Sequence, residues 1–413
     1  MRAAPKRERV LVIGVSPKGI PRAVAEDHLD ELERLVDTAG GEVVGRFVQS
    51  RQAADPATYI GKGSVEGIGE AARREKASLV VFDDELSPGQ VRNLEEAWGD
   101  GVRVLDRPGL ILDVFALHAR SREARTQVEL AQLQYLLPRL AGRYSHLSRL
   151  GGGIGGRGAG EQKLELDRRK IRDRIARLRQ DLQKIEVARL VRRRGRRRSF
   201  QVAVAGYTNA GKTTLFNRLT QDSAYAADRL FATLDARAAR ASSRELANVI
   251  FVDTVGFVRK LPTSLVASFR STLAEIRDAD LVLHVIDGSS SRADEEERIA
   301  VETFEELGVP RERILPVWTK ADLAGNGGHA GAGLRVSGTT GTGIPELIAR
   351  IRERLLPESE EFRVRIPYTS PRAIAAARAA FRVLDEQDRG DGLWMRLAGE
   401  RRHLRPLLRF VEA

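Results

Sequence analysis

Residues 206–213 read GYTNAGKT, and they are the stretch whose residue types and spacing most clearly predict chemistry. They follow an apolar run at 200–205 and precede a helical pattern at 215–219. In the order strand, glycine-rich turn and helix, the backbone N–H groups of the turn can surround a β-phosphate, and the positive end of the helix faces the same oxygens. The sequence therefore predicts a phosphate-binding loop made of Gly206, Tyr207, Thr208, Asn209, Ala210, Gly211, Lys212 and Thr213.

Two side chains of this loop have a predicted chemical role. Lys212 is placed to reach the β- and γ-phosphates as a point charge, and the Thr213 hydroxyl is placed to bind Mg²⁺. We treat Lys212 as a solvent-exposed loop residue, which contributes to nucleotide binding and little to the stability of the fold. The alternative is a chance turn before a helix, and the motifs farther along the chain weigh against it.

Two downstream segments carry the residues that we expect to sense a γ-phosphate. Thr233, in FATLD, is placed to be a second Mg²⁺ ligand. Asp253, in DTVG, can hold a magnesium-bound water, and the N–H of Gly256 can bond the γ-phosphate. Loss of that phosphate would release both segments. We expect catalytic roles for Lys212, Thr233 and Gly256, and nucleotide contacts from Phe231, Ala232, Thr233, Leu234 and Asp235 and from Asp253, Thr254, Val255 and Gly256.

The motif TKAD at 319–322 predicts which base is bound. A carboxylate at Asp322 can accept hydrogen bonds from the N1–H and N2–H₂ groups of guanine, which adenine does not offer. A backbone N–H in the segment 337–339 can then bond the guanine O6. The predicted ligand is GTP or GDP with Mg²⁺, and the predicted base pocket is Thr319, Lys320, Ala321, Asp322, Ser337, Gly338 and Thr339.

Charge is concentrated in one region of the 413-residue chain. Residues 139–198 contain twenty Lys or Arg and six Asp or Glu, a net charge of +14, while the whole chain carries +12. Such a stretch is typical of a surface that binds a polyanion, and an aromatic content of 5% favours contacts with phosphate over base stacking. The alternative is the solvated face of a long helix. Cysteine is absent, which excludes disulfides and thiolate chemistry. No apolar run is long enough to span a membrane.

The pattern of apolar residues predicts an α/β protein in four parts. Residues 1–120 alternate short apolar strands with amphipathic helices, which favours a parallel N-terminal sheet. Residues 121–199 predict an antiparallel helical hairpin, a basic arm whose tip at 150–160 reads LGGGIGGRGAG. Residues 200–356 form the phosphate-loop domain, and 357–413 a small C-terminal α+β domain. The tip is either a plain flexible linker or, with Arg157 among glycines, a point of close approach to RNA phosphates.

On these motifs the chain resembles the HflX GTPases. The resemblance rests on the four nucleotide motifs together with DDELSPGQVRNLE at 83–95, LILDVFALHARSREARTQVELAQLQYLLPRL at 110–140, the glycine-rich tip, and DTVGFVRKLPTSLVASFRSTL at 253–273. It implies a cytoplasmic, Mg²⁺-dependent GTPase that binds the large ribosomal subunit and splits or rescues stalled ribosomes. We expect it to contact rRNA through the arm and Arg157, to bind no DNA and to be a monomer.

The tip and the base motif depart from the family pattern, and the position after the DxxG glycine departs from many other GTPases. The tip reads RGAGEQKLE at 157–165 where the family has RGPGETQLE, and Thr319 stands where the family has asparagine. Many GTPases have a water-orienting glutamine after the DxxG glycine, and this chain, like the family, has Phe257 there. A phenyl ring cannot orient water by hydrogen bonding, so we expect slow intrinsic hydrolysis and stimulation by a partner surface, the ribosome.

Two other functions remain open at this point. One is a nucleoside triphosphatase that remodels RNA, and the other is an assembly factor in which GTP sets the affinity of the arm for rRNA. Asp322 favours guanine over adenine in either case.

The Asp322→Asn variant tests the base assignment. It replaces one acceptor oxygen by a donor, so guanine nucleotides should bind more weakly and xanthine nucleotides, which carry an oxygen at C2, more tightly. Competition between GDP and XDP in a fluorescence binding assay measures both changes. An unaltered preference would show that residues 319–322 do not hold the base.

Overall fold

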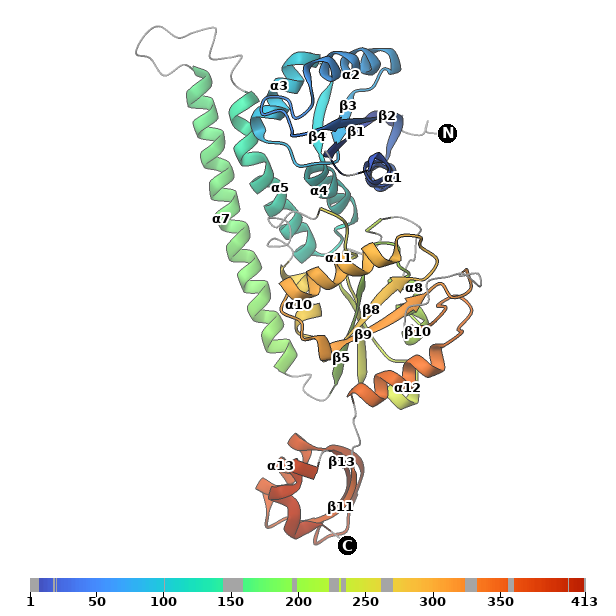
Figure 1. Cartoon of the computed structure of the whole chain (residues 1–413). Coiled ribbons are helices and arrows are strands. Elements are labelled where there is room, and N and C mark those ends of the chain that lie inside the picture. Colours follow the sequence, from blue (N-terminus) through green and yellow to red (C-terminus); the bar gives the residue numbers. More distant parts are fainter. Residues whose placement is uncertain are drawn as a thin grey trace, which may run out of the picture.

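The structure is a computed structural model that describes residues 7–17, 19, 21–99, 101–143, 159–194, 199–222, 230–231, 235–260, 270–323, 333–355, 360–399 and 401–411. Figure 1 shows four parts in chain order. We call them the N-terminal part (7–118), the arm (helices α5 and α7), the central part (199–355) and the C-terminal part (360–411).

The N-terminal part is a four-stranded parallel sheet in the order β2-β1-β3-β4, covered by helices on both faces. Neighbouring residues of β1 point to opposite faces: Val10 and Val12 join the core under α1 and α4, whereas Leu11 and Ile13 join the core under α2 and α3. Its elements are β1 (Glu8–Pro17), α1 (Arg22–Thr38), β2 (Gly41–Arg51), α2 (Lys62–Glu75), β3 (Leu79–Phe82), α3 (Pro88–Trp98), β4 (Arg103–Asp106) and α4 (Arg107–His118).

The arm consists of α5 (Arg122–Arg143) and α7 (Ala159–Arg194), which run side by side and antiparallel (Figure 1). Leu130 of α5 and Ile175 and Leu178 of α7 form the buried seam between them. Glu129 accepts two hydrogen bonds from Arg174, at 2.7 and 2.8 Å. The connector with Arg157 lies outside the described residues.

The base of the arm is fixed to the N-terminal part through one carboxylate. Asp106, at the end of β4, is fully buried and accepts hydrogen bonds from the Tyr135 hydroxyl (2.6 Å) and from Arg139 (2.8 Å). Both donors lie on α5. Because the Asp106 carboxylate also caps α4 through the N–H of Gly109 (3.0 Å), one side chain joins a strand, the following helix and the arm.

The central part is a six-stranded sheet in the order β10-β9-β8-β5-β7-β6, in which only β6 runs antiparallel to its neighbour. Helices α8 and α12 cover one face, and α10 and α11 the other. Its elements are β5 (Phe200–Gly206), α8 (Lys212–Thr220), β6 (Arg237–Arg240), η1 (Arg244–Leu246), β7 (Val249–Asp253), α10 (Arg270–Arg277), β8 (Leu281–Asp287), α11 (Ala293–Glu306), η2 (Arg311–Arg313), β9 (Ile314–Thr319), β10 (Leu334–Arg335) and α12 (Ile344–Leu355).

The C-terminal part is a three-stranded antiparallel sheet in the order β11-β13-β12 with one face covered by helices. Its elements are β11 (Glu360–Pro367), α13 (Pro371–Ala380), β12 (Arg382–Asp388), β13 (Gly392–Gly399) and η3 (Arg401–Phe410). The α/β class predicted from the sequence, with its parallel sheets and α+β end, is confirmed.

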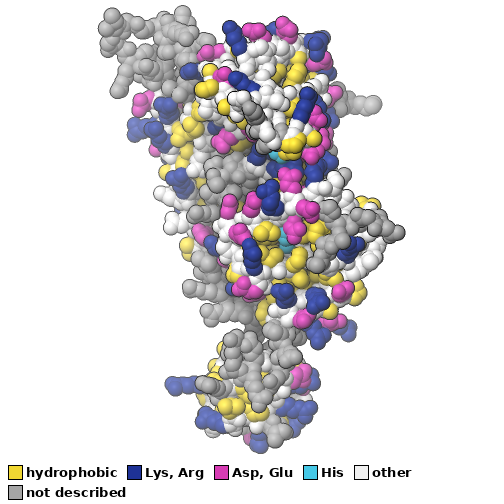
Figure 2. All heavy atoms as spheres, in the orientation of Figure 1, with side chains coloured by type: hydrophobic (Ala, Val, Ile, Leu, Met, Phe, Trp, Pro, Cys, Tyr) yellow, Lys and Arg dark blue, Asp and Glu magenta, His cyan; other side chains and the backbone are white. Residues whose placement is uncertain are grey.

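The surface view agrees with the charge count along the chain. On the face seen in Figure 2, basic and acidic side chains are interspersed over the N-terminal and central parts. The net +14 of residues 139–198 leaves the rest of the chain close to neutral. Among the residues that the structure describes, no helix combines the length and apolar character that crossing a membrane requires.

The Leu178→Ala variant tests the packing of the arm. Leu178 is 2% exposed, so its truncation should destabilise the contact between α5 and α7 by about 2–5 kcal/mol. Amide hydrogen exchange should accelerate in both helices. Leu166→Ala, at a position of the same helix that is 56% exposed, is the matched control. Equal exchange in the two variants would contradict the observed seam.

Candidate nucleotide-binding site

The phosphate-binding loop connects the end of β5 to α8 and has two positions that need glycine. Gly206 has φ 154°, and a Cβ there would lie 2.1 Å from the carbonyl oxygen of Val285 on β8. Gly211 has φ 86° and immediately precedes α8. The loop therefore passes too close to the neighbouring strand, and turns too sharply into the helix, for a side chain at either position.

Lys212 is the first residue of α8 and is only 7% exposed. Its Nζ donates a hydrogen bond to the carbonyl oxygen of Tyr207 at 2.6 Å. Burial lowers the pKa of Lys212 to about 8, against the opposing effect of the Asp253 carboxylate. The expectation that Lys212 is a solvent-exposed loop residue is therefore wrong, because the segment after β7 covers it.

Thr213 and Asp253 meet at the place where Mg²⁺ is expected. The Thr213 hydroxyl donates to Oδ2 of Asp253 at 2.8 Å, and Asp253 is fully buried at the end of β7. A hydroxyl and a carboxylate are the hard oxygen donors that Mg²⁺ prefers beside phosphate oxygens and waters, so these residues fit the ion. In the described ranges no cluster of three or more His, Cys, Asp or Glu side chains is arranged to hold a metal. Thr233, the other predicted ligand, lies outside those ranges with Ala232 and Leu234.

Gly256 lies directly against the phosphate-binding loop. A Cβ on Gly256 would come within 2.7 Å of Thr208 Cγ2 and 2.9 Å of Lys212 Nζ. The next residue, Phe257, donates its N–H to the Gly206 carbonyl (3.0 Å) and accepts from the Thr208 N–H (2.7 Å). Two backbone hydrogen bonds thus join the DTVG segment to the phosphate loop.

The ring of Phe257 is a core side chain. It is 1% exposed and packs edge-to-face against Phe304 of α11, with ring centroids 5.4 Å apart. A buried ring in this cluster has no group that can hydrogen-bond a water molecule. The position after Gly256 therefore offers no water-orienting side chain, as the sequence indicates.

The predicted base pocket is tied to the phosphate loop by Thr319. Its hydroxyl, 3% exposed at the end of β9, lies 2.6 Å from the Ala210 carbonyl and 3.0 Å from the Ile286 carbonyl. A hydroxyl has one proton, so it donates fully to only one of them, whereas an asparagine amide would supply two donors. Threonine thus keeps the connection to the loop, with fewer donors.

Asp287 and Arg218, which the sequence did not single out, hold the two segments of the predicted base pocket, 319–322 and 337–339. Lys320 pairs with Asp287 at 2.7 Å. Arg218 of α8 donates to the carbonyls of Gly338 (3.0 Å) and Thr339 (2.5 Å). Ser337 is fully buried, Ala321 donates its N–H to the Val336 carbonyl, and Asp322 is exposed in the turn after β9. An arginine on α8 gives no signal of this role, because its partners lie about 120 residues away.

One described end of the FATLD segment packs on α4 of the N-terminal part, and the other is bonded to the residues immediately before α5 of the arm. Phe231 is 3% exposed, and its ring lies edge-to-face on Phe115 of α4 with centroids 4.7 Å apart. Asp235 accepts hydrogen bonds from the N–H groups of Arg120 (2.8 Å) and Ser121 (3.0 Å), at the start of α5. The sequence predicted nucleotide contacts for Phe231 and Asp235, and the structure places both side chains against α4 and α5.

Three family models match consecutive stretches of the chain. They are described as GTP-binding GTPase N-terminal (residues 26–116), GTP-binding GTPase Middle Region (118–196) and 50S ribosome-binding GTPase (201–320). A GTPase HflX of Caldanaerobacter subterraneus subsp. tengcongensis is 42% identical over 92% of this chain and 88% of its own length. The GTPase HflX of Escherichia coli K12 is 42% identical over 83% of this chain and 82% of its own. The chain belongs to the HflX GTPase family.

Membership of the HflX family makes this chain a P-loop GTPase that binds guanine nucleotides and hydrolyses GTP. Among solved structures, a GTP-binding protein of Sulfolobus solfataricus in complex with GDP is 24% identical, with a TM-score of 0.46 over 84% of this chain and 98% of that one. The three family models and the HflX relatives confirm the resemblance noted from the sequence motifs at the level of the HflX family.

The Gly256→Ala variant tests how closely the DTVG segment approaches the loop. The added Cβ would push Gly256 away from Thr208 and Lys212, so binding of a GTP analogue should weaken about tenfold or more, and GDP binding should change less. Isothermal titration calorimetry with both nucleotides measures the difference. Gly63→Ala is the control, because no atom lies within 4 Å of the Cβ it adds. Equal losses for GDP and the GTP analogue would contradict a role for Gly256 at the γ-phosphate.

Proposed function

We propose that this protein is a GTP-switched factor that binds the large ribosomal subunit and splits or rescues stalled ribosomes. The observation that carries the proposal is the joining of a GTPase site to a long basic arm in one molecule. The arm begins at α5, and Asp235, two residues after Thr233, is bonded to Arg120 and Ser121 immediately before that helix. The family-model description 50S ribosome-binding GTPase for residues 201–320 supports the same partner.

We propose that the nucleotide site follows the sequence assignment. Lys212 would hold the β- and γ-phosphates, and the Gly256 N–H would bond the γ-phosphate. Thr213 and Thr233 would be the Mg²⁺ ligands, and Asp253 would hold a magnesium-bound water. Mg²⁺ supplies positive charge that neutralises the phosphate oxygens. The proposed base contacts are those of residues 319–322 and 337–339, and the proposed domain limits are 1–120, 121–199, 200–356 and 357–413.

The arm is proposed to be the part that enters RNA. Between residues 169 and 184 of α7, the described arginine and lysine side chains are exposed, and the helix extends over 36 residues. Each phosphate contact releases counterions, so binding through the arm depends steeply on salt. Because the ring of Phe257 is buried, we propose that hydrolysis is slow until the ribosome orders the site. A cytoplasmic monomer is part of the same proposal.

Ribosome splitting tests the proposal directly. Intact ribosomes incubated with the protein and a non-hydrolysable GTP analogue should sediment as separate subunits, and GTP hydrolysis should accelerate when large subunits are added. Arg157→Glu, or a shortened 151–160 segment, should abolish splitting while leaving nucleotide affinity unchanged. Arg311→Glu, on an arginine whose side chain is 83% exposed in the central part, is the matched charge control.

Two results would contradict the proposal. Splitting that survives both arm changes would make the tip a simple connector. Nucleotide hydrolysis that responds to free RNA and not to ribosomes would favour the RNA-remodelling or assembly function instead.

A further inference from the structure

Tyr207, the second residue of the phosphate-binding loop, forms hydrogen bonds with Lys212 of the same loop, with Glu31 of α1 and with Arg259 after the DTVG segment. Its carbonyl oxygen accepts the hydrogen bond from Lys212 Nζ at 2.6 Å. Its hydroxyl donates to Oε2 of Glu31 at 2.6 Å and accepts from the N–H of Arg259 at 3.0 Å. Glu31 lies on α1 of the N-terminal part, and Arg259 follows Gly256 by three residues. One side chain therefore joins the loop, the DTVG segment and another part of the chain.

The contact between Tyr207 and Glu31 is dry and charge-assisted. Tyr207 is 6% exposed and Glu31 is 7% exposed. Burial, and next the negative charge of Glu31, raise the pKa of Tyr207, so the hydroxyl keeps its proton and donates it to the carboxylate. A hydrogen bond to an ionised group in a water-excluded place is stronger and more directional than one at the surface.

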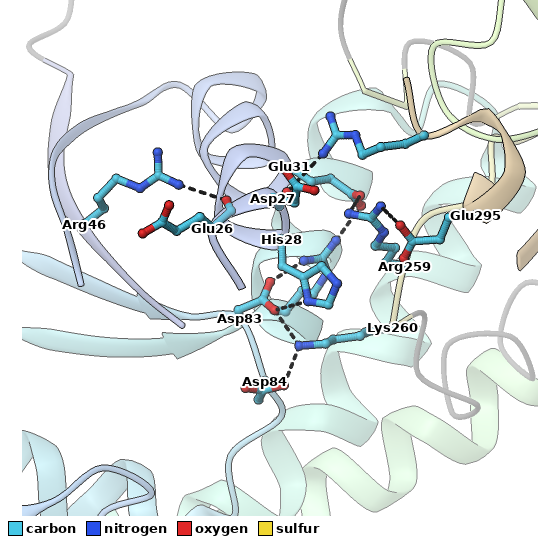
Figure 3. Close-up of polar contacts among 12 residues, drawn as sticks. Glu26, Asp27, His28, Glu31, Arg46, Asp83, Asp84, Arg259, Lys260 and Glu295 are labelled. Carbon is cyan, nitrogen blue, oxygen red and sulfur yellow. Dashed lines mark hydrogen bonds and ion pairs between the residues drawn. The ribbon is translucent and has the colours of Figure 1, made fainter. Parts of the chain in front are cut away.

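Further ion pairs surround this contact, and those of Arg259 with Glu31 and of Lys260 with Asp83 and Asp84 cross between the central and N-terminal parts (Figure 3). Arg107, fully buried at the start of α4, donates to Glu31 Oε1 at 2.5 Å and also to Asp83. From the central part, Lys260 Nζ reaches Asp83 Oδ2 at 2.5 Å, and Arg259 lies 3.8 Å from Glu31. Figure 3 shows Arg259 and Lys260 directed from the central part toward these acids. The remaining partners are Asp84 for Lys260 and Glu295 for Arg259.

These pairs hold the segment after Gly256 at both ends. Phe257 is bonded to the phosphate loop through its backbone, and the Arg259 N–H is bonded to the Tyr207 hydroxyl of the same loop. Toward the N-terminal part, Lys260 is bonded to Asp83, and the Arg259 side chain forms an ion pair with Glu31. Glu31 and Asp83 are buried, and a buried ion that loses its partner is strongly unfavourable. The ion pairs of Arg259 and Lys260 with these acids therefore resist separation. Gly256, whose N–H is assigned to the γ-phosphate, directly precedes this fixed segment.

We infer that Glu31 is a positioning residue of the GTPase site. Through the Tyr207 hydroxyl and Arg259 it holds the segment after Gly256 against the phosphate-binding loop. The N-terminal part is thus a component of the hydrolytic site, because it sets where the γ-phosphate contact lies. The inference depends on the GTPase activity of the family and on the loop assignment, and is independent of the proposed ribosomal role.

Tyr207→Phe tests the inference, because it removes one hydroxyl and keeps the ring. In the full-length protein, the single-turnover rate constant for GTP hydrolysis at saturating GTP should fall about tenfold, while GDP affinity changes less than about threefold. The matched control is Tyr135→Phe, since the Tyr135 hydroxyl also donates at 2.6 Å to a buried carboxylate, that of Asp106, away from the phosphate loop. The control should keep the wild-type rate.

Glu31→Gln supplies the second measurement. It keeps an acceptor for the Tyr207 hydroxyl and removes the charge that pairs with Arg107 and Arg259, so hydrolysis should fall with GDP affinity retained. The double variant with Tyr207→Phe should be no slower than the slower single variant, because both changes break one connection. If Glu31→Gln does not fold, the comparison of Tyr207→Phe with Tyr135→Phe decides alone. A rate for Tyr207→Phe equal to or above the Tyr135→Phe rate, or additive losses in the double variant, would overturn the inference.

Discussion

The arrangement of this molecule depends on one buried cation, Arg107. Its side chain has no exposed area, and two carboxylates, Glu31 and Asp83, make that burial possible. Burial by itself would lower the pKa of Arg107, but the charges of Glu31 and Asp83 outweigh it and hold the guanidinium charged. Since an arginine cannot lose its proton in a protein, the two acids must stay close to it.

The same two acids carry the contact with the central part. Burial would raise the pKa of Asp83, yet the hydrogen bond from His28 and the charges of Arg107 and Lys260 together hold it below its usual range. Glu31 takes the Tyr207 hydroxyl on its other oxygen. Arg107 therefore holds Glu31 and Asp83 in place. Other oxygens of the same two carboxylates bind Tyr207 of the phosphate loop and Lys260 after the DTVG segment.

Helix α5 of the arm is connected both to the residue next to Arg107 and to the FATLD segment. Asp106 precedes Arg107 in the chain and binds Tyr135 and Arg139 of α5. In the FATLD segment, Asp235 accepts hydrogen bonds from the N–H groups of the two residues that precede α5, Arg120 and Ser121. The hydrophobic side chains Leu230, Phe231, Val255 and Val258 share the core of α1, α4 and α5. The FATLD and DTVG segments thus both pack on α4 and α5, at the base of the arm.

Local patterns in the sequence determined the chemistry and the element order. The phosphate loop could be predicted because its glycines, lysine and threonine are neighbours in the chain, and the seam of α7 because Ile175 and Leu178 repeat at helical spacing. The strands of the N-terminal sheet followed from short apolar runs in the sequence.

Only the tertiary structure decided which side chains serve the site from a distance. Tyr207 and Glu31 are 176 residues apart, and Lys260 and Asp83 are 177 apart, so no spacing or periodicity links them. The burial of Lys212 was also hidden, because it results from Gly256 lying over the loop. A site made of residues that are neighbours in the chain can be predicted from the sequence alone. The pairing of charges across two folded parts depends on how those parts pack, and packing is decided only when the whole chain is folded.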